Sequence, residues 1–400
     1  MKVFFLGAVP SANLNSGDSG GLSSIDTQTL MTRVGHNTGN MLIGHSVLRH
    51  LSVQNWTADY TLLASEIEKE YDHIVIPASN FLYSGYDLGG MAQFVENVKL
   101  PCTMIGVGSQ APTYDSPIEL QKGTLRLLQV VSERSVSIGA RGHFTAHWLN
   151  KLGIKNVEVI GCPSFFWTCN PTLSITKKDF KHVSRLALNG SRNVITHSSD
   201  PQKMRRVETE LLRQALGFKA EFFAQNEYEE IVLARGRKEE INDSVLQPIL
   251  DYYGASQRDD VANFFRNHCR IFFDIPSWAE AVKEHDFSIG TRFHGNMIAL
   301  QNGVPAVVIS HDVRTQELCE LLHIPFLRLP DISRLSIEWM YKMADFDSIT
   351  TVYNSLFNNY IDFLESNKLR HVLKKEHILP RSNGMSCYKS VQALLNDKGL

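Results

Sequence analysis

The sequence predicts an α/β protein built from two Rossmann-like domains that face each other across a cleft. Short apolar or β-branched runs alternate with segments of helical length, which is the pattern of a parallel sheet covered on both faces. This alternation occurs twice along the chain. A length of 400 residues also exceeds what one hydrophobic core usually supports, so two domains are expected.

The first domain is predicted over residues 1–182. Each of its strands is a short apolar run followed by a segment long enough to hold a helix. The predicted strands are Val3 to Leu6, His73 to Pro77, Cys102 to Val107, Ser135 to Ala140 and Val157 to Ile160. We expect these strands to pair in parallel, with helices on both faces of the sheet.

The second domain is predicted over residues 183–345. Its boundary is placed near Lys177 to Leu186, where polar and basic residues replace strand-like sequence. The charged stretch from Glu227 to Tyr252 is one helix or two. The predicted strands are Asn193 to His197, Ala220 to Ala224, Arg270 to Asp274, Phe287 to Ile289 and Ala306 to Ile309, and Lys203 to Leu216 is a predicted helix.

A third segment, residues 346–400, is predicted to form C-terminal helices that pack back on the N-terminal domain. Within it, Tyr353 to Leu364 has a helical pattern and is expected to cross to the first domain. The pattern changes from alternating strands and helices to helices alone after Ile337.

The composition excludes several classes of protein. The hydrophobic fraction is 43%, the charged fraction is 20% and the net charge is −2, which gives no electrostatic reason to expect nucleic acid as a partner. No apolar run approaches the ~18 residues of a membrane span, so no integral membrane segment is expected. The six cysteines form no C-x-x-C pair, which favours a reducing, cytoplasmic setting.

The stretch from Phe287 to Ser310 is the most informative part of the chain. It predicts a buried strand, a turn at Thr291 to Gly295, a helix, and a second buried strand. Gly303 is placed to end the helix, and Pro305 blocks its continuation. In an open α/β sheet, ligands bind beyond the carboxyl ends of the strands, where such a turn opens onto a helix N-terminus.

Arg292 and His294 stand in this turn, where free backbone N–H groups and the helix dipole favour an anion. The sequence therefore predicts an anion site that includes Gly295. An arginine in such a turn also pairs with carboxylates in many proteins, and a histidine beside an apolar strand is often a core residue, so both of these readings stay open.

The chain resembles the polysaccharide pyruvyl transferase family, most clearly at this turn. The family's usual Arg-Leu-His appears here as Arg292, Phe293 and His294, followed by a helix of small residues and by Gly303, Val304 and Pro305. The replacement of leucine by Phe293 leaves the two polar residues and their spacing unchanged.

Weaker matches follow in the right order along the chain, and three of them lack an acid. Asn37 to Asn40 looks like the family's N-x-G-D turn, with Asn40 in the place of the acid. Ser137 to Arg141 looks like a strand that normally precedes Asp, and here Gly142 follows it. Gly161, Cys162 and Pro163 resemble an Asp-Pro turn without its acid, and Ser310 to Arg314 resembles a further loop of the family.

The resemblance implies an architecture like that of the GT-B glycosyltransferases, with the active site in the cleft. It also implies transfer of pyruvate from phosphoenolpyruvate to a sugar as a ketal. Arginine recognises phosphate and carboxylate groups in a bidentate manner. Arg141 and Arg292, in opposite domains, are therefore expected to hold the donor, with Arg314 and His197 as further candidates.

The expected catalytic residues are His294 and Arg292. Ketal formation needs a proton at the methylene carbon and a base for two sugar hydroxyls, and a group that titrates near neutrality serves both needs. No cofactor is expected, because arginine and helix N–H groups can stabilise the departing phosphate without a metal. His143 and His147 have i, i+4 spacing, but no third ligand accompanies them.

The acceptor is expected to be a sugar, either free or linked to lipid or polymer. Asn37 and Asn40 are candidate acceptor-binding residues, and Tyr83 and Trp167 follow predicted strands, where their rings would stack on a sugar. A lipid-linked acceptor would bring the protein to the inner face of the membrane. The sequence leaves the acceptor sugar and the oligomeric state open, a homo-oligomer included.

Two alternatives remain at this stage. A nucleotide-sugar glycosyltransferase of the same shape would also place a positive residue at this helix, but it would usually carry an acid near the helix end, where Gln301 and Asn302 stand. A carbohydrate-binding protein without catalytic activity is the second alternative, and it is supported only by the altered positions Asn40, Gly142 and Cys162.

Overall fold

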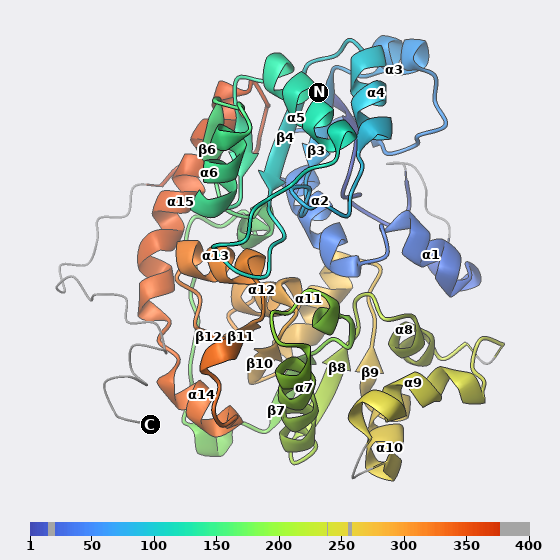
Figure 1. The fold of residues 1–400 in the computed structure, drawn as a ribbon, viewed down its shortest axis with the longest axis vertical. Helices are drawn as coiled ribbons and strands as arrows, with labels where there is room; N and C mark the ends of the chain where they lie inside the picture. Colours follow the sequence, from blue (N-terminus) through green and yellow to red (C-terminus); the bar gives the residue numbers. More distant parts are fainter. Residues whose placement is uncertain (15–20, 238, 255–257, 377–400) are drawn as a thin grey trace.

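The computed structural model describes residues 1–14, 21–237, 239–254 and 258–376. In these residues it contains two six-stranded parallel sheets with helices around them. The two sheets lie in the upper and lower halves of Figure 1. The predicted α/β fold with two Rossmann-like domains is therefore confirmed.

The first sheet has the strand order β2-β1-β3-β4-β5-β6. All of its neighbouring strands pair in parallel. Its strands are β1 (Lys2–Phe5), β2 (Asn55–Thr57), β3 (His73–Pro77), β4 (Cys102–Val107), β5 (Ile138–Ala140) and β6 (Val157–Val159). The helices of this half are α1 (Thr27–Arg33), α2 (Thr38–His50), α3 (Ala64–Glu70), α4 (Gly89–Asn97), α5 (Lys122–Arg134) and α6 (His143–Lys151), with 3-10 turns at Leu22–Ser24 and Pro163–Phe166.

The second sheet has the order β12-β11-β10-β7-β8-β9, so the chain changes direction across the sheet between β7 and β10. This is a topological switch point, where ligands of such sheets usually bind. Its strands are β7 (Arg185–Asn189), β8 (Lys219–Phe223), β9 (Cys269–Arg270), β10 (Phe287–Gly290), β11 (Ala306–Ser310) and β12 (Phe326–Arg328).

The remaining helices surround this second sheet or follow it. They are α7 (Pro201–Ala215), α8 (Tyr228–Arg235), α9 (Asp243–Tyr253), α10 (Arg258–His268), α11 (Ile275–Lys283), α12 (Phe293–Gln301), α13 (Val313–Leu322), α14 (Ile337–Met343) and α15 (Asp347–Ser366), with 3-10 turns at Phe180–His182, Asn193–Thr196 and Leu329–Asp331. The charged stretch left open as one helix or two forms α8 and α9, and Gly236 in the left-handed conformation (φ 64°) ends the first of them.

The prediction of a strand at Asn193 to His197 is wrong. This segment is a 3-10 helix, and the first strand of the second sheet is β7, which begins at Arg185 near the end of the segment assigned to the boundary. Leu186, Ala187 and Leu188 lack β-branches but are buried between β8 and β10. This segment forms a strand because the strands on both sides pair with it, although its residues have a low intrinsic preference for strands. The short strands β2 and β12 were not predicted.

Helix α15 runs along the left edge of Figure 1. Its Phe363 packs against β5, where a Cβ at Gly139 would lie 3.0 Å from Cζ of Phe363. The Asn367 side chain after it accepts hydrogen bonds from the backbone N–H groups of Val136 and Ser137, at 3.1 and 3.2 Å. Tyr360 lies 3.0 Å from Nδ1 of His50 in α2. Residues 377–400 of the predicted C-terminal segment lie outside the described residues.

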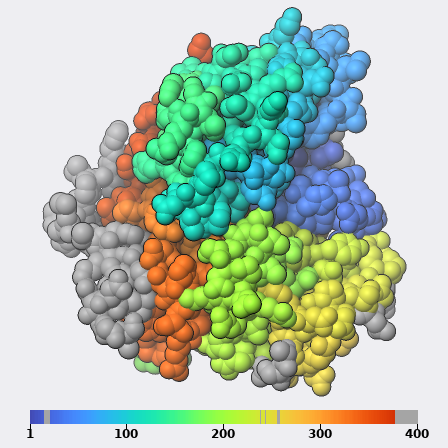
Figure 2. All heavy atoms as spheres, viewed as in Figure 1, coloured from blue at the N-terminus to red at the C-terminus, as the bar shows by residue number. Residues whose placement is uncertain are grey.

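The carboxyl ends of the two sheets face each other. The N-terminus of α2 donates a hydrogen bond from the Thr38 N–H to the Gln225 carbonyl, which follows β8. On the other side, the Val313 N–H in α13 donates to the Ala111 carbonyl, which follows β4. Figure 2 shows the two halves in contact across this face of the molecule. No helix in the described part of the chain is both long and apolar enough to cross a membrane.

Gly44 in α2 offers a test of how tightly this central helix packs. A Cβ at this position would lie 2.5 Å from the Val9 carbonyl oxygen in the loop after β1. Gly44→Ala should therefore destabilise the protein by about 1–3 kcal/mol, although alanine is the better helix former. Gly90→Ala in α4 is the matched control, because a Cβ there meets nothing within 4 Å. Urea unfolding in which both variants behave alike would contradict the prediction.

Candidate active site

Strand β10 and helix α12 place the turn that the sequence singled out. Gly290 has φ +148°, and a Cβ there would lie 3.0 Å from Cα of Asn189 in β7, so the two strand ends can approach closely. The Arg292 N–H donates to the Asn189 carbonyl, and α12 then begins at Phe293. The side chain of the N-cap residue, Arg292, makes no capping hydrogen bond, so the N–H groups of the first turn keep their preference for an anion.

His294 stands in this first turn and faces the first domain. It is 8% exposed, and its Nε2 lies 3.7 Å from Sγ of Cys162. A Cβ at Gly39, in the first turn of α2, would lie 3.1 Å from its Nδ1. Burial holds the pKa of His294 well below 6.5, and the charges of Arg141, Arg314 and Arg292 lower it further. The imidazole is therefore neutral at pH 7, and the expectation that this group titrates near neutrality is wrong for the unliganded protein.

Arg141 follows β5 and is only 2% exposed. Its guanidinium donates to the carbonyl oxygens of Gly106 and Ala78, at 2.6 and 2.9 Å, and to Oδ1 of Asn80 at 3.3 Å. All three acceptors are neutral oxygens. Burial lowers the pKa of Arg141, but an arginine remains charged in proteins. The first domain thus contributes a buried positive charge that no directly bonded carboxylate neutralises.

Arg314, at the second residue of α13, approaches from the opposite domain. Its Nη2 lies 3.4 Å from Oδ2 of Asp312, and its Nε is buried without a partner. Asp312 caps α13 through the Thr315 N–H and also accepts from Nε2 of Gln110 in the first domain, at 2.7 Å. Asp312 therefore fixes the start of α13 against the first domain, and Arg314 keeps hydrogen-bonding capacity for a ligand.

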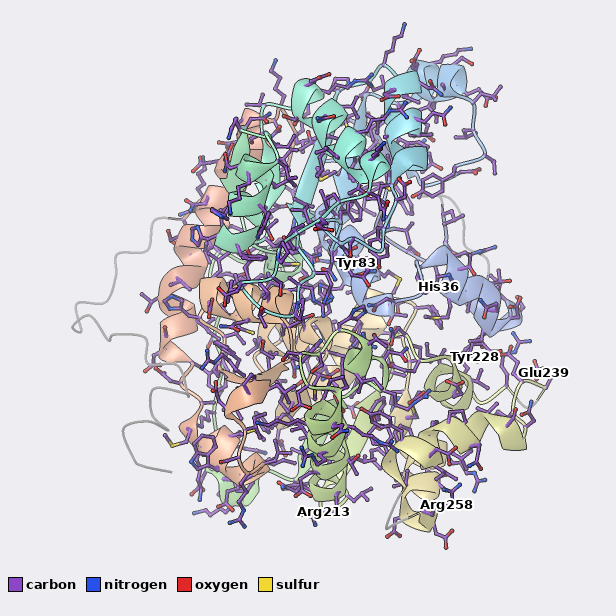
Figure 3. All side chains as sticks on the ribbon, in the orientation of Figure 1. His36, Tyr83, Arg213, Tyr228, Glu239 and Arg258 are labelled. Atoms are coloured by element: carbon purple, nitrogen blue, oxygen red, sulfur yellow. The ribbon has the colours of Figure 1, made fainter. Side chains whose placement is uncertain are left out.

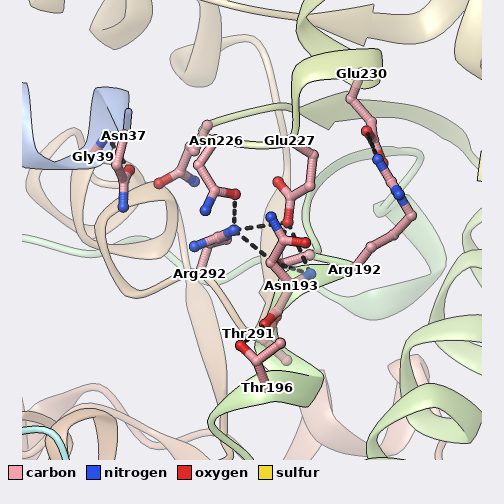
Figure 4. A network of polar contacts seen from close by, with 12 residues as sticks. Asn37, Gly39, Arg192, Asn193, Thr196, Asn226, Glu227, Glu230, Thr291 and Arg292 are labelled. Carbon is pink, nitrogen blue, oxygen red and sulfur yellow. Dashed lines mark hydrogen bonds and ion pairs between the residues drawn. The ribbon is translucent and has the colours of Figure 1, made fainter. Parts of the chain in front are cut away.

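Arg292 is engaged in a network within the second domain, shown in Figure 4. Its Nη2 donates to Asn226, to Oγ of Ser191 at 2.6 Å and to Oε1 of Glu227 at 2.8 Å. Arg292 therefore does pair with a carboxylate, which the sequence had left as an open possibility. Its Nε is buried without a partner, so part of the guanidinium keeps a free donor.

Glu208 in α7 is a second buried acid of this network. Its Oε1 accepts from Oγ1 of Thr291, at 2.5 Å, and from the Ser191 N–H, at 3.2 Å. Burial raises the pKa of Glu208 to about 8. The carboxyl group is therefore protonated at neutral pH, and Glu227 alone supplies the negative charge beside Arg292, which holds the pKa of Glu227 low.

His197 and Tyr83 meet across the domain boundary. Their ring centroids are 5.8 Å apart at an interplanar angle of 86°, and Tyr86 packs against Tyr83 in the same edge-to-face way. Tyr83 is half-buried and lies at the junction of the two halves in Figure 3. Burial and the charge of Arg314 lower the pKa of His197, which indicates that His197 lies near the arginine cluster.

Three other predicted residues lie at the starts of α12 and α2, and they are Gly295, Asn37 and Asn40. Gly295 packs beside Asn189 and Gln225, where a Cβ would lie 2.7 Å from Nε2 of Gln225. Asn37 caps α2 through the Gly39 N–H at 2.8 Å, and Asn40 lies in the same first turn. Gly39 brings Asn37 close to His294, because a Cβ at Gly39 would lie 3.0 Å from Oδ1 of Asn37 and 3.1 Å from Nδ1 of His294. Asn37 is occupied as a cap.

Trp167 is not brought together with these residues. It is 7% exposed and packs further along α2, with the guanidinium of Arg49 5.3 Å above its ring and His45 beside it. Its Nε1 has no partner. Its assignment to acceptor binding stays a prediction.

Gly142, where the resemblance led us to expect Asp, leaves room for an acid from the other domain. Glu317 of α13 accepts from the Thr145 N–H at 2.7 Å and from Oγ1 of Thr145 at 2.8 Å. A Cβ at Gly142 would lie 2.6 Å from Oε1 of Glu317. An Asp at this N-cap would satisfy the same N–H, so Glu317 caps α6 from the second domain.

Two surface hollows lie away from this site. They have volumes of about 1050 and 1190 Å³ and flank α7 in the second domain, with Arg213 in the lining of both. Arg213 lies at the bottom of Figure 3, far from the domain junction. Within the described ranges, no three His, Cys, Asp or Glu side chains gather as a metal site would require.

Sequence reasoning missed the residues that support the arginines and His294. Glu208, Glu227 and Glu317 follow no motif in the chain, and Asp312 was noted only as part of the loop from Ser310 to Arg314. Each of these acids meets its partner through tertiary contacts. Only the positions of Glu227 and Asp312 next to strand ends carried a signal. Cys162 was noted as a missing acid rather than as the residue beside His294.

Glu208 provides a pH test of the network. A carboxyl group whose folded pKa is raised stabilises the fold at low pH and loses this contribution as pH rises through about 8. Wild type should therefore lose about 1 kcal/mol more stability than Glu208→Gln between pH 7 and pH 9. The glutamine carbonyl can still accept from Thr291 and Ser191. Equal losses in urea unfolding at the two pH values would contradict a protonated Glu208.

The exchange of acids at position 142 can be tested by a double-mutant cycle. Glu317→Ala should cost about 1–3 kcal/mol, because the buried N–H of Thr145 loses its acceptor. Gly142→Asp should also destabilise the protein, because its side chain enters the space of Glu317. The double variant should be more stable than the sum of the two changes predicts, by about 1 kcal/mol or more. Strict additivity in thermal unfolding would contradict this account.

Three solved structures illustrate the distant likeness of the fold. UDP-GlcNAc 2-epimerase of Methanocaldococcus jannaschii, in complex with UDP-GlcNAc and UDP, is 12% identical, with 99% of each chain covered and a TM-score of 0.41. The Neisseria meningitidis UDP-GlcNAc 2-epimerase is 11% identical over 92% of this chain and 100% of that chain, with a TM-score of 0.42. Anabaena HepE, in complex with UDP and glucose, is 11% identical over 92% and 95%, with a TM-score of 0.38.

These likenesses are too distant to bear on ligand or chemistry. No curated protein matches the chain significantly. The profile of the family described as polysaccharide pyruvyl transferase matches residues 37–313. This match includes the turn with Arg292 and His294, as well as Arg141 and Cys162, and it spans well over half of the 400 residues. The protein belongs to the polysaccharide pyruvyl transferase family.

Proposed function

We propose that the protein transfers pyruvate from phosphoenolpyruvate to two hydroxyls of a sugar, as a ketal, in the synthesis of a polysaccharide or glycoconjugate. One observation carries this proposal. A buried, neutral histidine stands at the uncapped N-terminus of α12, and the charges of three arginines from both domains act on it. This environment suits a small, multiply charged anion that must react beside a base.

The donor would be held by the positive groups that keep free capacity. Phosphoenolpyruvate carries a phosphate and a carboxylate, and both favour guanidinium partners. Arg141 has only neutral acceptors, and Nε of Arg314 is free. Arg292, Gly295 and His197 are the remaining donor-side candidates. Arg292 would act through its unpartnered Nε, because Glu227 holds its Nη2.

His294 would serve as the base for the two sugar hydroxyls. Its low pKa leaves it neutral in the unliganded protein. A bound anion offsets the charges of the arginines and therefore raises this pKa, so that the imidazole can hold the proton that it takes up. The first hydroxyl then adds to C2 of the donor, and the second displaces phosphate. Arginine and N–H groups suffice to stabilise the phosphate.

The acceptor would reach the site from the rim formed by Tyr83 and His197, whose rings meet across the domains. Asn37 and Asn40, at the start of α2, are the further acceptor-side candidates. Stacking of a sugar on Tyr83 fits the half-buried position of this ring. A lipid-linked acceptor would place the protein at the inner face of a membrane, in a cytoplasmic setting.

The glycosyltransferase alternative gains no support from the end of α12. A ribose-binding acid is expected there, but Gln301 accepts from Oγ1 of Thr168 at 3.1 Å and is 5% exposed. The helix end is thus neutral and buried. A carbohydrate-binding protein without activity would retain sugar binding but would have no reason to hold a base among arginines.

The proposal predicts that phosphoenolpyruvate raises the melting temperature at saturating concentration and that phosphate is released in the presence of a suitable sugar. His294→Ala should lower the rate of release by ~10²–10⁴-fold, as loss of a general base does. Arg314→Ala should weaken donor binding by ~10–100-fold, because a charge-assisted hydrogen bond is lost. Arg334→Ala, which removes an exposed arginine, is the control and should leave both unchanged.

Two results would contradict the proposal. One is the absence of any thermal shift with phosphoenolpyruvate in wild type. The other is stabilisation by a nucleoside diphosphate sugar in its place, which would favour the glycosyltransferase alternative. Circular dichroism of each variant separates loss of activity from loss of fold.

A further inference from the structure

Cys162 is the side chain that meets His294 from the first domain. Its Sγ lies 3.7 Å from Nε2 of His294 and 3.0 Å from Oγ of Ser164, and it is fully buried. The turn around it is fixed in place. Gly161 has φ +75°, and a Cβ at Gly106 would lie 2.7 Å from Cδ of Pro163. The thiol is therefore held against the imidazole by packing on β4.

The same positive charge acts on both groups. Arg141 interacts electrostatically with Cys162 and with His294, and its hydrogen-bond acceptors are all neutral. A thiol that gives up its proton becomes an anion, and a neighbouring guanidinium favours that anion. A histidine that gains a proton beside the same guanidinium is disfavoured. The arrangement therefore suits the thiol as proton donor, and the neutral imidazole becomes the proton acceptor once the bound anion offsets the arginine charges.

The proposed reaction needs both roles at once. Pyruvyl transfer adds a proton to the methylene carbon of the donor, while a base removes a proton from each sugar hydroxyl. His294 is neutral in the unliganded site. It therefore cannot donate a proton to the methylene carbon and at the same time act as the base for the first hydroxyl. An ordinary thiol carries its proton at pH 7, whereas an ordinary carboxyl does not. Cys162 thus places an S–H group at this turn, 3.7 Å from Nε2 of His294.

We propose that Cys162 donates the proton to the methylene carbon of phosphoenolpyruvate and that His294 restores it, an inference that rests on the proposed function. The S–H bond breaks, and the electron pair of the C=C bond forms the new C–H bond. The first hydroxyl oxygen bonds to C2 and gives its proton to His294, which returns it to the thiolate. The second hydroxyl then displaces phosphate, and its proton leaves with the phosphate through His294.

The test uses phosphoenolpyruvate in D₂O with a panel of methyl hexopyranosides, followed by NMR for deuterium in vinyl or methyl groups and by phosphate release. Cys162→Ala should lower both signals by ~10²-fold or more, while phosphoenolpyruvate still raises the melting temperature. Cys102→Ser, which changes a buried cysteine at the start of β4, is the matched control and should behave like wild type. Cys162→Asp should recover part of the rate as pH falls from 7 to 5, because a carboxyl group donates only while protonated.

Three outcomes would overturn the inference. Cys162→Ala with a rate within about threefold of wild type would show that the thiol gives no proton, since a general acid contributes ~10²–10⁴-fold. Loss of the thermal shift in Cys162→Ala would assign the residue to donor binding instead. Wild type without thermal shift, deuterium incorporation or phosphate release would reject the donor itself, and this failure differs from the others because it appears before any substitution.

Discussion

The buried charge of Arg141 is the constraint on which the site depends. A guanidinium without a bonded carboxylate is costly inside a protein, and here three neutral oxygens, from the end of β4 and from the loop after β3, accept three of its five N–H groups. Its charge is left to act on its surroundings. That charge lowers the pKa of His294 and acts on Cys162. The electrostatic environment of His294 and Cys162 therefore depends on the hydrogen bonds that hold Arg141 at the end of the first sheet.

Helix α13 of the second domain is bonded to the first domain beside this charge. Its first turn holds Arg314, and Asp312 ties that turn to Gln110 of the first domain. Further along, Glu317 caps α6, and Oε2 of Glu320 accepts from the Tyr114 hydroxyl at 2.7 Å. One helix of the second domain is thus fixed along much of its length to the first. These contacts hold Arg314 in a fixed position relative to the first domain, which contributes Arg141.

The fold and the central turn were predictable because their signals are local. The strand, turn and helix around Arg292 and His294 lie within one short segment, and only its flanking residues were needed to place them. The strand β7 was missed because Leu186 to Leu188 become a strand only between β8 and β10. Cys162 and His294 are 132 residues apart, and Glu317 reaches Thr145 over 172 residues. No local pattern reports such pairs, because closure of the two domains creates them.

Glu317 and Gly142 show that a sequence position and the space around it can differ in chemistry. An acid expected beside β5 is absent from that segment, yet a carboxylate from α13 occupies the space and caps the same helix. Read position by position, the sequence reports only a glycine where an acid was expected. The space around Thr145 nevertheless holds a carboxylate, because a residue far away in the sequence supplies it. A motif that looks incomplete in the sequence can therefore be complete in the folded chain.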